Sequence, residues 1–268
     1  MDNEGEKTSL SLLKVYCIRA MSRCRIWIII LFLMTVFIFS GQGFAREENR
    51  GQFIEKITEL KKIYFGLNQY NEFADFLESM LPNVKDKQKA ILNYFLALIR
   101  FEQLKFLEKN QIWEEYFDKG DIYRAEFRKR LDFAIGHIPP DDRFLLNALL
   151  LKWRFLKNEQ DINEENALKD LLKAVKVYSQ DSEDAQAIKE IADALMQDKA
   201  VSSARYVYTL YAEKIDASTK SPDYIKTEAE GALKEGKIEL ATTLFDLYID
   251  RIKSKSREFL IRELSEIA

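Results

Sequence analysis

The chain has 268 residues, of which 47% are hydrophobic and 12% aromatic, so it can bury a sizeable core and is not expected to be disordered. Its formal net charge at pH 7 is −3, with acidic and basic residues well mixed, which gives no electrostatic reason to expect a nucleic-acid partner. Nine glycines and four prolines are few for this length, and such sparse turn residues favour long helices over many short strands.

An apolar run lies near the start of the chain. The uncharged residues Ile26–Phe39 follow three arginines and precede Gly43 and Ala45, which are small residues at the −3 and −1 positions of a cut after Ala45. This order is typical of a secretory signal peptide, so residues 1–45 are predicted to be removed and residues 46–268 to form one exported domain. An uncleaved anchor is the alternative, although a bilayer needs about 20 apolar residues.

Both cysteines of the chain, Cys17 and Cys24, precede the apolar run. The exported part is therefore predicted to contain no thiol, which excludes disulfides, thiolate catalysis and cysteine metal sites from it. A start at Met21 would give the signal peptide an ordinary length of about 25 residues, and this is a further hypothesis.

Apolar residues recur at steps of three and four along most of the remaining chain, which predicts amphipathic helices. These helices are expected at about residues 53–68, 70–81, 87–107, 122–138, 142–156 and 167–178, before a repeated pair and a last amphipathic helix at 259–267. A further helix, which carries Trp113, Tyr116 and Phe117, is predicted to end at Gly120, because glycine tolerates the left-handed conformation.

The repeated pair consists of residues 191–215 and 228–252, which show the same pattern at an offset of 37 positions. Five identities fall at helical spacings, namely Ala192 with Ala229, Ala204 with Ala241, Leu210 with Leu247, Tyr211 with Tyr248, and Ile215 with Ile252. This pattern predicts two copies of one helix–turn–helix unit, each with an apolar stripe on every helix.

The second copy follows a known order of residue types. Gly236, Ile238, Ala241, Phe245 and Tyr248 stand where the tetratricopeptide repeat has its turn glycine, flanking aromatic, close-packing alanine, second-helix aromatic and small residue. Residues 184–252 therefore resemble a tetratricopeptide-like repeat, with a poorer first copy at Lys199 to Tyr211. The resemblance implies an all-α fold, a right-handed solenoid of about five antiparallel helical hairpins with a C-terminal capping helix.

In the tetratricopeptide family, ligands lie on a concave wall formed by the first helix of each hairpin. Carried over by position, this wall comprises Gln186, Lys189, Asp193, Met196, Asp223, Lys226, Glu230 and Leu233. Asp193 and Glu230 take the place of the asparagine that clamps a peptide carboxylate, so that ligand mode is not expected. Alternatively, these charges form solvated i, i+4 pairs worth about 0.2 to 0.5 kcal/mol each.

Residues for common catalytic and metal chemistry are scarce. His137 is the only histidine, and neither a glycine-rich phosphate loop nor an HExxH motif occurs, so no enzyme, cofactor or metal is expected. His137 lies beside Pro139, in a predicted interhelical turn, where a capping or exposed role is expected.

The large aromatic residues have two interpretations. Trp113 and Trp153 lie among apolar residues at helical spacing and are expected in the core, with an exposed anchor for a partner as the alternative. Tyr208 and Tyr211 share the buried stripe, whereas Tyr206 is expected at the surface.

The expected function is an exported, non-enzymatic scaffold that binds a protein or peptide partner in a bacterial cell envelope, periplasmic or secreted. Two alternatives remain: an envelope-remodelling accessory module that contacts peptidoglycan, and an inner-membrane-anchored subunit of a larger assembly. Nucleic acid is not an expected partner, and membrane contact is expected only through an uncleaved N-terminal segment.

Overall fold

The computed structural model describes residues 50–218, 222–253 and Ser265. Within these residues the chain forms ten α-helices and one 3-10 turn, without any strand, so the predicted all-α class is confirmed. The predicted signal peptide at 1–45 lies outside the described residues, as does all of the predicted capping helix at 259–267 except Ser265.

The chain divides into two compact units between Ile63 and Tyr64. The described part of the first unit is residues 50–63, which belong to helix α2 (Arg50–Gly66). The second unit begins with the last turn of this helix and holds all the other helices.

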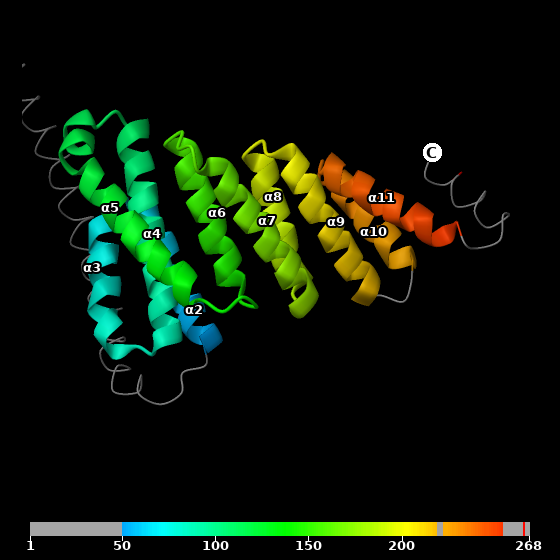
Figure 1. The fold of residues 1–268 in the computed structure, drawn as a ribbon, viewed down its shortest axis with the longest axis horizontal. Coiled ribbons are helices and arrows are strands. Elements are labelled where there is room, and N and C mark those ends of the chain that lie inside the picture. Colours follow the sequence, from blue (N-terminus) through cyan, green and yellow to red (C-terminus); the bar gives the residue numbers. More distant parts are fainter. Residues whose placement is uncertain (1–49, 219–221, 254–264, 266–268) are drawn as a thin grey trace, which may run out of the picture. The chain divides into compact units, whose positions relative to one another are not determined.

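The helices of the second unit follow one another with short connections (Figure 1). They are α3 (Tyr70–Met80), α4 (Asp86–Lys109), α5 (Trp113–His137), α6 (Arg143–Asn158), α7 (Glu164–Asp181), α8 (Ala185–Gln197), α9 (Val201–Ser218), α10 (Pro222–Lys234) and α11 (Ile238–Ile252). A 3-10 turn, Leu81–Asn83, follows α3 and contains Pro82, which lacks the N–H needed to continue the helix.

Helices α4 to α11 pack as antiparallel hairpins, each against the next hairpin. The pairs α4–α5, α6–α7, α8–α9 and α10–α11 are in contact along their lengths. Alternate helices also touch, since α6 contacts both α4 and α8, and α9 contacts both α7 and α11. Helix α4 contacts α3, α5 and α6, which explains why apolar residues occupy several of its faces.

Five turns of the second unit share one backbone geometry. Each contains a single residue with φ between 52° and 73°, namely Asn68, Gln111, Gln160, Lys199 or Gly236. In the fourth turn, the N–H of Lys199 donates to the carbonyl of Met196 (3.0 Å) and that of Ala200 to the carbonyl of Leu195 (2.9 Å). The other four turns repeat this pair of hydrogen bonds, which defines a Schellman helix end.

The same turn geometry also occurs outside the residues where a repeat is visible in the sequence. Lys199 and Gly236 occupy equivalent positions, as the alignment of the two copies predicted. The turns at Gln111 and Gln160 have this geometry in two earlier hairpins, α4–α5 and α6–α7, whose sequences do not show the repeat pattern. Backbone geometry is therefore repeated where the sequence pattern is not.

The predicted helix end at Gly120 is wrong. Helix α5 continues from Trp113 through a buried Gly120 to His137. A Cβ at this position would lie 2.9 Å from Nη1 of Arg124 and 3.9 Å from Cδ2 of Leu104. Gly120 does not have the positive φ that a left-handed turn residue would need. Its missing Cβ instead allows Arg124 to pack closely against the helix.

Candidate functional site

The predicted wall lies on α8 and α10, where Lys189 is occupied by a contact between hairpins. Its Nζ lies 3.3 Å from Oε1 of Glu228 and 5.7 Å from the ring centre of Tyr211, and its side chain is only 15% exposed. The Tyr211 hydroxyl donates to the same Glu228 oxygen at 2.9 Å. Helices α8, α9 and α10 are therefore joined through this group of three residues.

Asp193, the second charged residue predicted on this part of the wall, makes similar contacts. It accepts a hydrogen bond from the Tyr208 hydroxyl (2.6 Å) and lies 3.1 Å from Nζ of Lys237. Burial and then the hydrogen bonds to the two carboxylates raise the pKa of both Tyr208 and Tyr211. Both hydroxyls therefore remain protonated donors at neutral pH.

These contacts differ from the i, i+4 pair that was the alternative for Lys189 and Asp193, because their partners come from other helices and from the α10–α11 turn. A Lys189→Glu substitution would place two carboxylates together. It would therefore disturb the packing of hairpins as well as any ligand.

The remaining predicted wall residues are not gathered into a pocket. Met196 and Lys226 are half-buried, whereas the exposed ones are Gln186, Asp223, Glu230 and Leu233. None of the predicted residues lines the two grooves described below. The wall stays a prediction, and two of its charges already stabilise the stack.

The start of α5 carries an exposed group of aromatic residues, which we name the aromatic cluster: Trp113, Tyr116 and Phe117. The rings of Trp113 and Phe117 stack at 6.2 Å with an interplanar angle of 29°, and Tyr116 meets both edge-on at 5.8 Å. Trp113 is 44% exposed and Phe117 77% exposed. The expectation that Trp113 packs in the core is therefore wrong, whereas Trp153 is buried as predicted.

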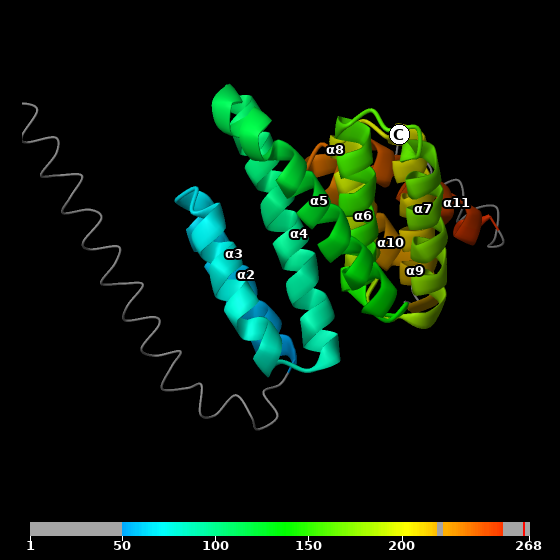
Figure 2. The ribbon, with the colours of Figure 1, turned by 60° about the vertical axis from the view of Figure 1, so that its left-hand side comes forward.

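Helix length explains this exposure. Nε of Arg124 lies 2.9 Å from Oε2 of Glu159, so the α6–α7 turn meets α5 three turns after its start. The first turns of α5 project beyond that turn, and the end of the α4–α5 hairpin stands clear of it (Figure 2). No part of the neighbouring hairpin is long enough to cover Trp113 and Phe117.

The inner ring of the aromatic cluster is fixed to the rest of the unit. Nη2 of Arg124 donates to the Tyr116 hydroxyl at 2.5 Å, and the guanidinium carbon lies 5.1 Å from the centre of the ring. Gly120 leaves space for this guanidinium, while Glu159 holds it from the α6–α7 turn. The cluster is thus held in place before any partner arrives.

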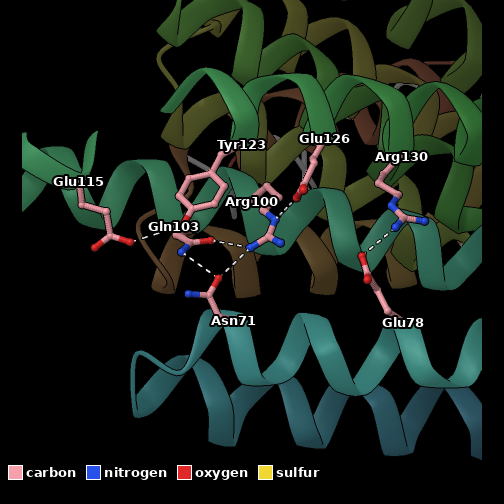
Figure 3. A network of polar contacts seen from close by, with 8 residues as sticks. All are labelled: Asn71, Glu78, Arg100, Gln103, Glu115, Tyr123, Glu126 and Arg130. Atoms are coloured by element: carbon pink, nitrogen blue, oxygen red, sulfur yellow. Dashed lines mark hydrogen bonds and ion pairs between the residues drawn. The ribbon is translucent and has the colours of Figure 1, made fainter. Parts of the chain in front are cut away.

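A polar network joins α3 to α4 and α5 (Figure 3). Arg100 contacts Glu126 (2.5 Å) and Asn71 (3.0 Å), and it also donates to the buried Gln103 (2.9 Å). Arg130 contacts Glu78 (2.7 Å) and the buried Asn93 (3.2 Å). Sequence reasoning missed this network, because charges on a helix rich in Glu and Lys are usually solvated.

Shallow grooves also lie elsewhere in the described part of the second unit. The groove between α9 and α11, of about 630 Å³, is lined by Glu213, Asp246 and the ion pair of Arg205 with Glu239 (2.5 Å). The groove among α5, α6 and α7, of about 460 Å³, is lined by apolar and charged residues, including Arg128. Both are open surface depressions.

The single histidine lies at the opposite end of α5 from the aromatic cluster. His137 lies at the exposed C-terminal end of α5, with Nδ1 2.8 Å from the Phe133 carbonyl and its ring stacked on Phe133 at 4.1 Å. Over residues 50–218 and 222–253, no group of three or more His, Cys, Asp or Glu side chains could hold a metal ion. Over the same residues, no helix is both long and apolar enough to cross a bilayer.

Comparison with known proteins identifies no relative: no family model matches the chain, and no curated protein is significantly similar to it.

Proposed function

We propose that the protein is a scaffold in the bacterial cell envelope that binds a segment of a partner protein through the aromatic cluster. The observation that carries this proposal is the exposure of Trp113 and Phe117 on a helix that is anchored to its neighbours. The location outside the cytoplasmic membrane rests on the signal-type sequence at residues 1–45. We further infer that the stacked hairpins are arranged as a right-handed solenoid.

The energetics favour a binding role for this surface. Aromatic side chains carry about 150 to 250 Å² each, so Trp113 and Phe117 together expose roughly 250 Å² of apolar surface. Covering that area would contribute on the order of 6 kcal/mol before the cost of association is subtracted. Tryptophan and tyrosine are enriched among residues that dominate binding energy, and fixing them in advance lowers the entropy lost on binding.

The aromatic cluster replaces the predicted wall as the favoured binding surface. Lys189 and Asp193 are held by neighbouring helices, so a ligand at the wall would have to compete with contacts that stabilise the stack. The aromatic cluster imposes no such competition, since its two outer rings face solvent.

Site-specific photo-crosslinking in the cells that produce the protein tests the proposal. A photoreactive residue in place of Phe117 should capture one defined envelope protein. Ile238 is the matched control position, because it is also an exposed apolar residue (56%) and lies on α11, away from the cluster. Trp113→Ala should weaken the captured complex by about 2 kcal/mol, or roughly 30-fold in affinity.

Identical products at positions 117 and 238 would contradict the proposal, as would the absence of any protein product at 117. Binding of the full chain to purified peptidoglycan without a protein partner would instead favour the accessory module that contacts the cell wall.

A further inference from the structure

We propose that the partner segment at the aromatic cluster is a positively charged amphipathic one, in which lysine or arginine lies about one helical turn from apolar residues. This inference rests on the proposed function and adds the chemistry of the partner. It is carried by the distribution of charge around the exposed rings.

An acidic stripe runs beside the aromatic cluster. Glu114, Asp118 and Asp121 follow at helical spacing along one side of α5, next to Trp113 and Phe117, and all three are exposed. Residues 113–121 contain four acidic side chains but only one basic side chain, Lys119. Lys119 lies 3.4 Å from Glu115 and also interacts electrostatically with Asp118, so this single cation offsets only part of the four negative charges.

The helix dipole accounts for only part of this pattern. Glu114 lies in the first turn of α5, where a negative charge stabilises the helix itself. Asp118 and Asp121 lie in later turns, where that effect has fallen away. Asp121 is 3.2 Å from Arg124, but its side chain is 98% exposed, and ion pairs of this kind contribute little to stability.

The neighbouring α6–α7 turn carries further acidic residues. Arg124 ties Glu159 of this turn to α5, and no basic residue occurs from residue 158 to residue 165. Asp161 accepts hydrogen bonds from the backbone N–H of Asn163 and then from its side-chain amide, which hold the pKa of Asp161 below its usual value. The carboxylate therefore remains charged at neutral pH, but it lines the groove that contains Arg128, so the negative charge at the cluster comes from the stripe on α5.

The exposed rings and the acidic stripe together define the complementary segment. Apolar residues one turn apart would cover Trp113 and Phe117, as in other amphipathic helices that bind a protein surface. A lysine or arginine beside them would reach the stripe, and one placed over the exposed ring face would also gain a cation–π interaction. An acidic segment would be repelled by the same charges.

Two synthetic peptides provide the probe for this charge preference. Both have the same length and leucines at i, i+3, i+4 and i+7, but one carries lysines and the other glutamates at the flanking positions. Each peptide would be titrated into the full chain and its affinity measured by calorimetry. At low salt the lysine peptide should bind at least about tenfold more tightly than the glutamate peptide, and the difference should be smaller at about 0.5 M salt.

Variants separate the charge effect from the aromatic one. Glu114→Lys with Asp118→Lys should reverse the preference, whereas Asp132→Lys with Asp170→Lys, which changes the net charge equally and lies away from the cluster, should preserve it. Phe117→Ala should weaken the lysine peptide at least about tenfold. Circular dichroism of each variant should show unchanged helix content.

The outcomes distinguish this inference from the proposed function. If both peptides bind with equal affinity and Phe117→Ala abolishes the binding, the charge preference is overturned, while the aromatic cluster is still supported as the binding surface. Binding that is indifferent to Phe117→Ala would overturn both.

Discussion

At the scale of single residues, the turn positions carry stored strain. Lys199 has a φ of 63°, a left-handed conformation that costs a residue with a Cβ about 1 to 2 kcal/mol. Gln111 and Gln160 share this conformation, and only Gly236 has the residue type that adopts it without a steric cost. The repeated turn is therefore better adapted in the last hairpin than in the earlier ones.

Lys199→Gly should stabilise the protein by about 0.5 to 1 kcal/mol, because relief of the strain exceeds the extra chain entropy of glycine in the unfolded state. Denaturant unfolding of the full chain, followed by circular dichroism, would measure the change. Gly236→Ala is the matched control and should destabilise by about 1 kcal/mol, since its φ is 73°. A loss of stability in Lys199→Gly would show that the turn does not limit stability.

At the scale of elements, α5 depends on the space left at Gly120. The guanidinium of Arg124 occupies this space and from there contacts Tyr116 on its own helix and Glu159 on the α6–α7 turn. The absence of a Cβ at Gly120 thus lets one arginine hold Tyr116 of the aromatic cluster and also link the α4–α5 and α6–α7 hairpins.

Gly120→Ala should destabilise the protein by about 1 kcal/mol, because the charged hydrogen bonds that are lost exceed the gain in helix propensity. Gly136→Ala, on the same helix with no atom near the added Cβ, should be neutral or slightly stabilising. The two variants would be compared by thermal unfolding. In an Arg124→Ala background the cost at Gly120 should disappear, and its persistence would point to a clash with another group.

At the scale of the whole second unit, each hairpin contacts its immediate neighbours. Charged pairs link successive hairpins, as shown by Arg154 with Asp198 (2.6 Å) and Arg205 with Glu239. Because each described hairpin contacts its neighbours, the last described hairpin, α10–α11, should open before the interior ones.

Amide hydrogen exchange of the full chain should therefore be faster in α10 and α11 than in α4 and α6, with a difference in opening free energy of at least about 1 kcal/mol. Arg205→Ala should increase exchange in α11 while leaving α4 unchanged, because it removes a contact between α9 and α11 only. Equal protection across α4 to α11 would indicate a single cooperative unit.

Much of the helical structure was predictable from periodicity. Apart from α5, which was predicted as two helices divided at Gly120, the apolar stripes place the helices within a few residues of their observed bounds. They also assign Trp153, Tyr208 and Tyr211 to the core and Tyr206 to the surface, as observed. The matched turn positions Lys199 and Gly236 were also visible. These features follow from local spacing along one helix, which the chain itself specifies.

The binding surfaces depended on tertiary structure. Apolar residues at helical spacing predicted a buried position for both Trp113 and Trp153, yet Trp113 is exposed, because the α4–α5 hairpin is longer than the one packed against it. Lys189 likewise could have been solvated, but Glu228 of the next hairpin holds it. Sequence alone determined which residues share a helix face, whereas the lengths and packing of neighbouring helices decided which faces are covered, since burial depends on residues that are distant in the chain.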